Sequence, residues 1–88
     1  MERVEAELFT DGGNDAVVRL PGRNFPGVLI QGDTLSTLRS DMAELVELCA
    51  AGDLVEARHV ASLLQADLGA KLKRYTDVLE AHGIARPF

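Results

Sequence analysis

The sequence predicts an α+β domain, a three-stranded antiparallel β-meander over residues 1–32 followed by an antiparallel helical hairpin and short tail over residues 33–88. Short apolar runs with period 2 occupy the first third, as expected for strands with one wet face. Gly-Gly and Pro-Gly pairs separate these runs and indicate turns. After residue 33, apolar side chains recur at spacings of 3 and 4, which is typical of amphipathic helices. At 88 residues, the chain is predicted to form one domain.

The first two strands are predicted from alternation on either side of a turn. Residues 3–9 alternate, with Val4, Ala6 and Leu8 on the face expected to be half-buried and glutamates on the wet face. Residues 11–14 read Asp-Gly-Gly-Asn, which suits a tight turn. Residues 15–20 form the second strand, and the short connection predicts an antiparallel hairpin.

The third strand follows a proline-rich loop. Pro21-Gly22 ends the second strand, because proline cannot donate to a ladder and Pro-Gly suits a type II turn. Residues 28–31 then make a short strand that completes the meander.

Two helices follow, with recognisable caps. Asp33 or Thr34 caps the first helix, which runs to about residue 51 and ends at Gly52. Asp53 starts the second helix with Glu56 in a variant of the capping box, and Gly83 ends it. The first helix is expected to pack through one apolar stripe, formed by Leu35, Leu38, Met42, Leu45 and Cys49.

The second helix outruns the first. Residues 53–82 would span roughly 45 Å at 1.5 Å per residue, whereas the first helix is only about 27 Å long. Its apolar last third must lie over the sheet, break near Gly69, or pack on another chain. We favour a two-fold homodimer, the commonest closed assembly. The self-association residues expected are Leu68, Leu72, Tyr75, Val78 and Leu79.

Charge and hydropathy limit the classes of partner. The net charge is −5, and residues 1–56 alone hold eleven acids against four arginines, a balance of −7. An acidic surface repels phosphates and argues against nucleic-acid binding, while a basic protein partner stays open. No stretch approaches the roughly 18 apolar residues of a membrane span. The charged segment at residues 1–10 lacks the core of a signal peptide, so we expect a cytoplasmic protein.

The sequence holds no recognised catalytic constellation. It has no glycine-rich phosphate loop, and His59 and His82 with the single Cys49 cannot supply the close ligand set of a zinc site. Cys49 is expected on the apolar stripe, where a thiol is usually inert. We therefore expect no metal, no cofactor and no enzymatic activity.

The stretch from Arg19 to Asp33 is the best candidate for a binding site. Arg19 and Arg23 near a helix N-terminus would give an anion two sets of donors, with Phe25 as an apolar wall. Gln31 and Asp33 close the stretch. The alternative is that Asp33, Asp15 or Glu7 pairs with either arginine, and that Phe25 simply fills the core.

The same stretch carries a family resemblance. Residues 12–35 read GGNDAVVRLPGRNFPGVLIQGDTL and are similar to a small bacterial family of unknown function with the pattern GGN-x-AVVRLPGR-x-FPGV-x-x-QGD. The residues that fall on the pattern are Gly12, Gly13, Asn14, Arg19, Pro21, Gly22, Arg23, Phe25, Pro26, Gly27, Gln31, Gly32 and Asp33. The resemblance implies no activity.

These observations favour a non-enzymatic protein-binding or assembly module that is homodimeric through the second helix. One alternative is an acidic inhibitor, immunity-like or antitoxin-like, that covers a basic partner with Asp41, Glu44 and Glu47. A second is a small anion-binding or ligand-binding domain that uses Arg19 and Arg23.

Overall fold

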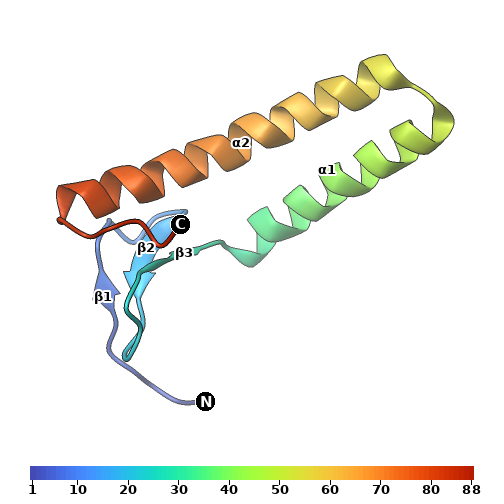
Figure 1. Cartoon of the computed structure of the whole chain (residues 1–88). Coiled ribbons are helices and arrows are strands. Elements are labelled where there is room, and N and C mark those ends of the chain that lie inside the picture. The colour runs from blue at the N-terminus through green and yellow to red at the C-terminus, as the bar shows by residue number, and fades with distance from the viewer. The chain divides into compact units, whose positions relative to one another are not determined.

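A computed structural model describes all residues from 1 to 88, and these form two compact units (Figure 1). The sheet unit comprises residues 1–31 and 71–88, and the helical unit comprises residues 32–70. The elements are, in chain order, β1 (Glu7–Leu8), β2 (Ala16–Arg19), β3 (Gly27–Leu29), α1 (Gly32–Ala51) and α2 (Leu54–Ala81). The predicted α+β class, with three strands before two helices, is confirmed.

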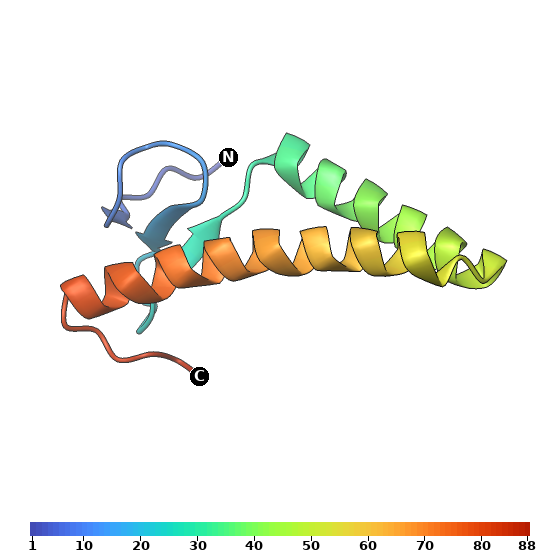
Figure 2. The same cartoon turned by 90° about the horizontal axis from the view of Figure 1, so that it is seen from above.

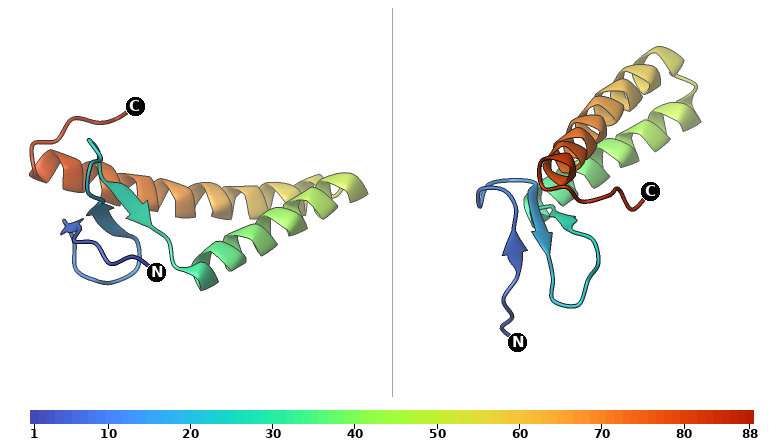
Figure 3. Two further views of the ribbon diagram at one scale, coloured as in Figure 1. Left: turned by 90° about the horizontal axis from the view of Figure 1, so that it is seen from below. Right: turned by 60° about the vertical axis from the view of Figure 1, so that its left-hand side comes forward.

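The three strands form one antiparallel sheet in the order β1-β2-β3, as the right-hand view of Figure 3 shows. In the register, Val18 of β2 lies opposite Leu8 of β1 and Gly27 of β3. The predicted Pro21-Gly22 turn joins β2 to β3: the amide of Arg23 donates to the carbonyl of Leu20 at 3.2 Å, and Gly22 has φ +79°. Only a residue without Cβ takes that φ at little cost, which is why glycine stands there.

The orientation predicted for the first strand is wrong. β1 is reduced to Glu7–Leu8, and the side chains of Val4 and Leu8 are exposed. Phe9 packs inward instead, and its amide donates to the carbonyl of Val17 at 2.9 Å. Alternation defines two faces of a strand but does not decide which one is covered. Here the covered face is the one that carries the larger aromatic side chain.

The other two strands also differ slightly from their predicted bounds. β2 is Ala16–Arg19 rather than 15–20, because Asp15 takes a left-handed φ of +58°. β3 is Gly27–Leu29 rather than 28–31. Shifts of one or two residues at the ends of elements are ordinary.

The core of the sheet unit joins β2 to the last turns of α2, which run across the sheet in Figure 2. Val17, Tyr75 and Leu79 are buried together, and Leu79 is only 1% exposed to solvent. Four half-buried side chains surround them: Phe9, Val28, Val78 and Ile84. The sheet of the same chain thus covers the apolar tail of α2.

This packing removes the reason for expecting a dimer through that tail. Tyr75, Val78 and Leu79 pack on β2 and its neighbours and need no second copy to cover them. Leu68 and Leu72, the other two residues expected in the interface, remain half exposed. The length argument had three outcomes, and the structure shows the first of them, in which the tail lies over the sheet.

Three of the four predicted helix ends are confirmed, but α1 begins at Gly32, so Asp33 and Thr34 lie inside its first turn instead of capping it. Gly52 and Gly83 take φ values of +74° and +65°, the left-handed conformation of a C-terminal cap. The carboxylate of Asp53 accepts the amide of Glu56 at 3.2 Å, as an N-cap does. α2 continues as one helix through Gly69, so the predicted alternative of a break there is wrong.

The helical unit holds few buried side chains. Ala57, Val60 and Leu64 of α2 are buried, whereas α1 has no buried residue. The half-buried leucines of α1 are Leu38, Leu45 and Leu48. Neither helix combines the length and hydropathy needed to cross a bilayer.

The stripe predicted for α1 is therefore only partly right. Leu38 and Leu45 are half-buried as expected, but Leu35, Met42 and Cys49 are exposed. Stripes that start one residue apart both satisfy a spacing of 3 and 4, and on a helix they lie about 100° apart. The spacing could not show which of the two meets α2.

Candidate functional site

The structure separates the two arginines of the predicted site. Arg19 forms a bidentate pair with Glu7, with Nε 2.9 Å from Oε1 and Nη2 2.8 Å from Oε2. Its Nη1 donates to the carbonyl of Asn24 at 3.3 Å, and its guanidinium lies 5.4 Å from the centre of the Phe9 ring. The alternative prediction, that Glu7 pairs with Arg19, is confirmed. The guanidinium of Arg19 thus makes its hydrogen bonds within the chain.

The pair has a measurable signature in the pKa of Glu7. The hydrogen bonds from Arg19 lower the pKa of the Glu7 carboxyl below its ordinary value, and the charge of Arg19 adds to this effect. Because the folded state has the lower pKa, the pair stabilises the fold above the pKa of the unfolded chain and is lost as pH falls through the folded value. In Arg19→Gln, the pKa of Glu7 is expected to rise to its ordinary value, as measured by carboxyl carbon NMR. The matched variant Arg23→Gln should leave it unchanged, and an unmoved Glu7 in Arg19→Gln would contradict the pairing.

Arg23 and Phe25 belong to a hollow on the other face of the sheet. Residues 17 and 19 point to the face covered by α2, so the neighbouring Val18 and Leu20 point away from it. The hollow has a volume of about 400 Å³. Its lining consists of Val18, Leu20, Arg23, Phe25, Pro26, Gly27, Val28 and Leu29. Of the two arginines and the phenylalanine expected at one site, Arg23 and Phe25 line this hollow and Arg19 does not.

Gln31 and Asp33 do not join this hollow. Gln31 is exposed after β3. Asp33 lies in the first turn of α1, where its carboxylate accepts the amide of Thr34 at 2.8 Å and its carbonyl accepts the hydroxyl of Thr37 at 3.1 Å. Both interactions are local to the start of the helix.

The basic run near the end of α2 is paired within the chain. Lys71 lies 3.0 Å from Asp15 in a largely covered ion pair, and Lys73 lies 2.6 Å from Asp77 in an exposed one. The hydrogen bond that Lys73 donates to the carboxylate of Asp77 raises the pKa of Lys73. Both lysines therefore already have an acidic partner within the chain.

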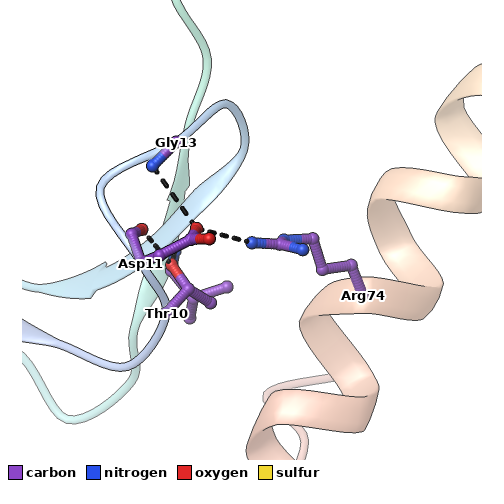
Figure 4. A network of polar contacts seen from close by, with 5 residues as sticks. Thr10, Asp11, Gly13 and Arg74 are labelled. Carbon is purple, nitrogen blue, oxygen red and sulfur yellow. Dashed lines mark hydrogen bonds and ion pairs between the residues drawn. The ribbon is translucent and has the colours of Figure 1, made fainter.

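A polar network ties the β1–β2 turn to α2, as Figure 4 shows. Asp11 Oδ1 accepts hydrogen bonds from Arg74 Nη2 and from the amide of Gly13, both at 3.4 Å. The hydroxyl of Thr10 donates to the carbonyl of Asp11 at 3.0 Å and accepts the amide of Val17 at 3.1 Å. These contacts satisfy the polar groups of the turn, and we assign the network a structural role.

The helical unit exposes a second apolar surface. In α1, Leu35, Met42, Val46 and Cys49 are exposed at spacings of 7, 4 and 3, which places them along one side of the helix. In α2, Leu54 and Leu68 are exposed beside the buried seam. We call these six residues the hairpin apolar face. Sequence reasoning assigned most of the α1 residues to the helix–helix contact and so missed this surface.

Comparison with known proteins places the chain in a family. No curated protein and no solved structure matches the chain significantly. A family model described as "Family of unknown function (DUF6959)" matches residues 1–88. The match covers both units, and the chain belongs to this family of unknown function.

Proposed function

We propose that the chain is a non-enzymatic protein-binding module that self-associates through the hairpin apolar face. The observation that carries the proposal is the exposure of large apolar side chains on a unit with almost no core of its own. Only Ala57, Val60 and Leu64 are buried in the helical unit, while Leu54 is 77% exposed and Val46 62%. Two helices with so small a seam gain stability when another layer covers them.

The six exposed residues gather on one side of the hairpin. In α1 the exposed stripe follows the half-buried one by a single position, since Met42 lies next to Asp41 and Cys49 next to Leu48. In α2, Leu68 lies four residues beyond the buried Leu64. On each helix, going from the covered residues to the exposed ones is a rotation in the same sense about the helix axis. In antiparallel helices that face each other, the same sense of rotation leads to the same side of the pair.

The size of this side suits a second copy. A helix of 20 residues is about 30 Å long, and two helices side by side are roughly 20 Å wide, which gives about 600 Å² of flat surface. A standard interface takes about 800 Å² of accessible surface from each partner, a comparable extent. Two hairpins stacked through such faces make a four-helix bundle, and a two-fold dimer produces it from identical chains.

Charge placement agrees with this arrangement. Glu44 and Glu47 lie on the side of α1 away from Met42 and Val46, so neither carboxylate would enter the bundle. Arg39 lies three residues before Met42 on the side of the interface, and its long side chain carries the guanidinium to the rim while its methylene groups cover apolar surface. The proposed interface thus differs from the one expected from sequence, which used the last third of α2. The two have Leu68 in common.

Light scattering tests the proposal with two matched variants. Met42→Glu with Val46→Glu places two charges on the hairpin apolar face, and Ser40→Glu with Ala51→Glu places two on the opposite side of α1, where both residues are exposed. The wild type and the second variant are expected at twice the chain mass of 9.5 kDa. The first variant should dissociate more than 100-fold more readily, because two apolar side chains contribute about 1.5–3 kcal/mol each when buried. A wild-type chain that stays monomeric at high concentration would refute the proposal.

An acidic inhibitor remains the second candidate. Glu44 and Glu47 are exposed and make no hydrogen bond or ion pair within the chain, so both carboxylates are free for a basic partner. Asp41, the third acid expected in that surface, is half-buried. The acidic surface is therefore smaller than the sequence suggested.

A further inference from the structure

We propose that the hollow on the uncovered face of the sheet binds a small apolar carboxylate. The hydrocarbon part would lie against Val18, Phe25 and Leu29, and the carboxylate would accept hydrogen bonds from the guanidinium of Arg23. This site lies in the sheet unit, and its argument is independent of the hairpin apolar face.

The walls of the hollow are mostly apolar side chains, and three of them are exposed. Leu20, Phe25 and Leu29 each keep between 42% and 54% of their surface exposed. The volume of about 400 Å³ falls in the lower part of the range of small-molecule sites, about 300–1,000 Å³. Such sites combine predominantly apolar walls with a few polar groups that fix orientation.

Arg23 supplies that polar group, and like Arg3 and Arg86 it has no partner within the chain, whereas four other cations of the sheet unit are paired. Arg19 pairs with Glu7, Lys71 with Asp15, Lys73 with Asp77 and Arg74 with Asp11. Arg23 lines the hollow and makes no hydrogen bond or ion pair through its side chain, although the chain has an excess of five acidic charges. A guanidinium in this position offers paired donors whose geometry matches a carboxylate.

The backbone around the hollow is held in place before a ligand binds. The β2–β3 turn is closed by the hydrogen bond from the amide of Arg23 to the carbonyl of Leu20. The carbonyl of Pro26, next to Phe25, accepts the hydroxyl of Tyr75 at 2.6 Å. Because this wall is already fixed, the protein loses less conformational entropy when a ligand binds.

The single cation beside an apolar surface selects the class of ligand. Nucleotides and polyphosphates carry several charges and need several donors, and the hollow provides one arginine. A neutral hydrocarbon would leave that arginine without a partner. A monocarboxylate with a short alkyl chain matches both features.

NMR titration of the full chain with octanoate, below its micelle concentration, tests the proposal. We expect saturable amide shifts at Val18, Phe25 and Leu29, and none of comparable size in α1. Arg23→Gln should weaken octanoate binding about 10-fold or more, since a hydrogen bond to a charged group is worth about 1.5–3 kcal/mol. Arg39→Gln, which removes an exposed arginine of α1, should bind octanoate as the wild type does.

Octanol provides the second arm, because it has the same chain without the carboxylate. Wild type should prefer octanoate to octanol, and Arg23→Gln should lose that preference while its other amide shifts stay in place. Equal binding of both ligands by the wild type would overturn the proposal. So would unsaturable shifts, or shifts that map to α1 instead of the hollow.

Discussion

Replacing Leu79 with alanine is expected to destabilise the chain by about 3 kcal/mol, within the range of 2–5 kcal/mol for deleting a buried leucine side chain. Leu79 is 1% exposed and packs with Val17 and Tyr75, so the substitution leaves a cavity between α2 and the sheet. For a chain of this size, 1 kcal/mol corresponds to about 4–8 °C in Tm, so the transition should fall by more than ten degrees. Thermal unfolding followed by Tyr75, the only tyrosine in a chain without tryptophan, measures it.

Leu72→Ala is the matched control for this prediction. Leu72 lies on the same helix, two turns earlier, and is half exposed. Its truncation should cost about 1 kcal/mol or less, since part of its surface already meets water. Equal losses for both variants would mean that Leu72 is buried as Leu79 is, and therefore that another copy covers the tail of α2. That outcome would restore the interface first expected from the sequence.

Local chemistry is why much of the fold could be predicted. The Pro21-Gly22 turn, the glycine caps at Gly52 and Gly83 and the Asp53 cap each depend on a few neighbouring residues. The change from period 2 to a spacing of 3 and 4 separates sheet from helices. These signals do not depend on tertiary contacts, so the order and type of the elements can be predicted from them.

The choice of buried face depends on distant contacts, and there the sequence was ambiguous. Residues 16–20 are apolar on both sides of the strand, so alternation could not show that Val17 faces the core. The same ambiguity hid the open sheet face and the hairpin apolar face. It also explains why the tail of α2 was assigned to a second copy, since its partner Val17 lies more than 50 residues earlier in the chain.

The candidate site could be predicted only in part. The pattern of residues 19–33 drew attention to two arginines and one phenylalanine, and the structure unites Arg23 with Phe25. Alternation along β2 places Arg19 on the opposite face, where Glu7 reaches it from β1. The register that brings Glu7 opposite Arg19 is a tertiary property, because it depends on how the two strands are paired.

Tyr75→Phe is expected to destabilise the chain by about 1–3 kcal/mol, although it removes a single oxygen atom. The hydroxyl of Tyr75 donates to the carbonyl of Pro26 at 2.6 Å, and both residues are buried. Phenylalanine keeps the ring packed against Val17 but leaves that carbonyl without this donor. A buried acceptor that loses its partner costs the full penalty of its desolvation. Urea unfolding followed by circular dichroism at 222 nm gives the free energy directly.

Thr76→Val separates this effect from a general loss of hydroxyl groups. The hydroxyl of Thr76, one residue further along α2, donates to the carbonyl of Lys73 at 3.1 Å in an exposed setting. Water can replace that hydrogen bond, so the change should stay within about 0.5 kcal/mol, as for most surface substitutions. If Tyr75→Phe were as mild as Thr76→Val, water would have to reach the carbonyl of Pro26. The loop that forms the wall of the hollow would then be anchored to α2 by apolar packing alone.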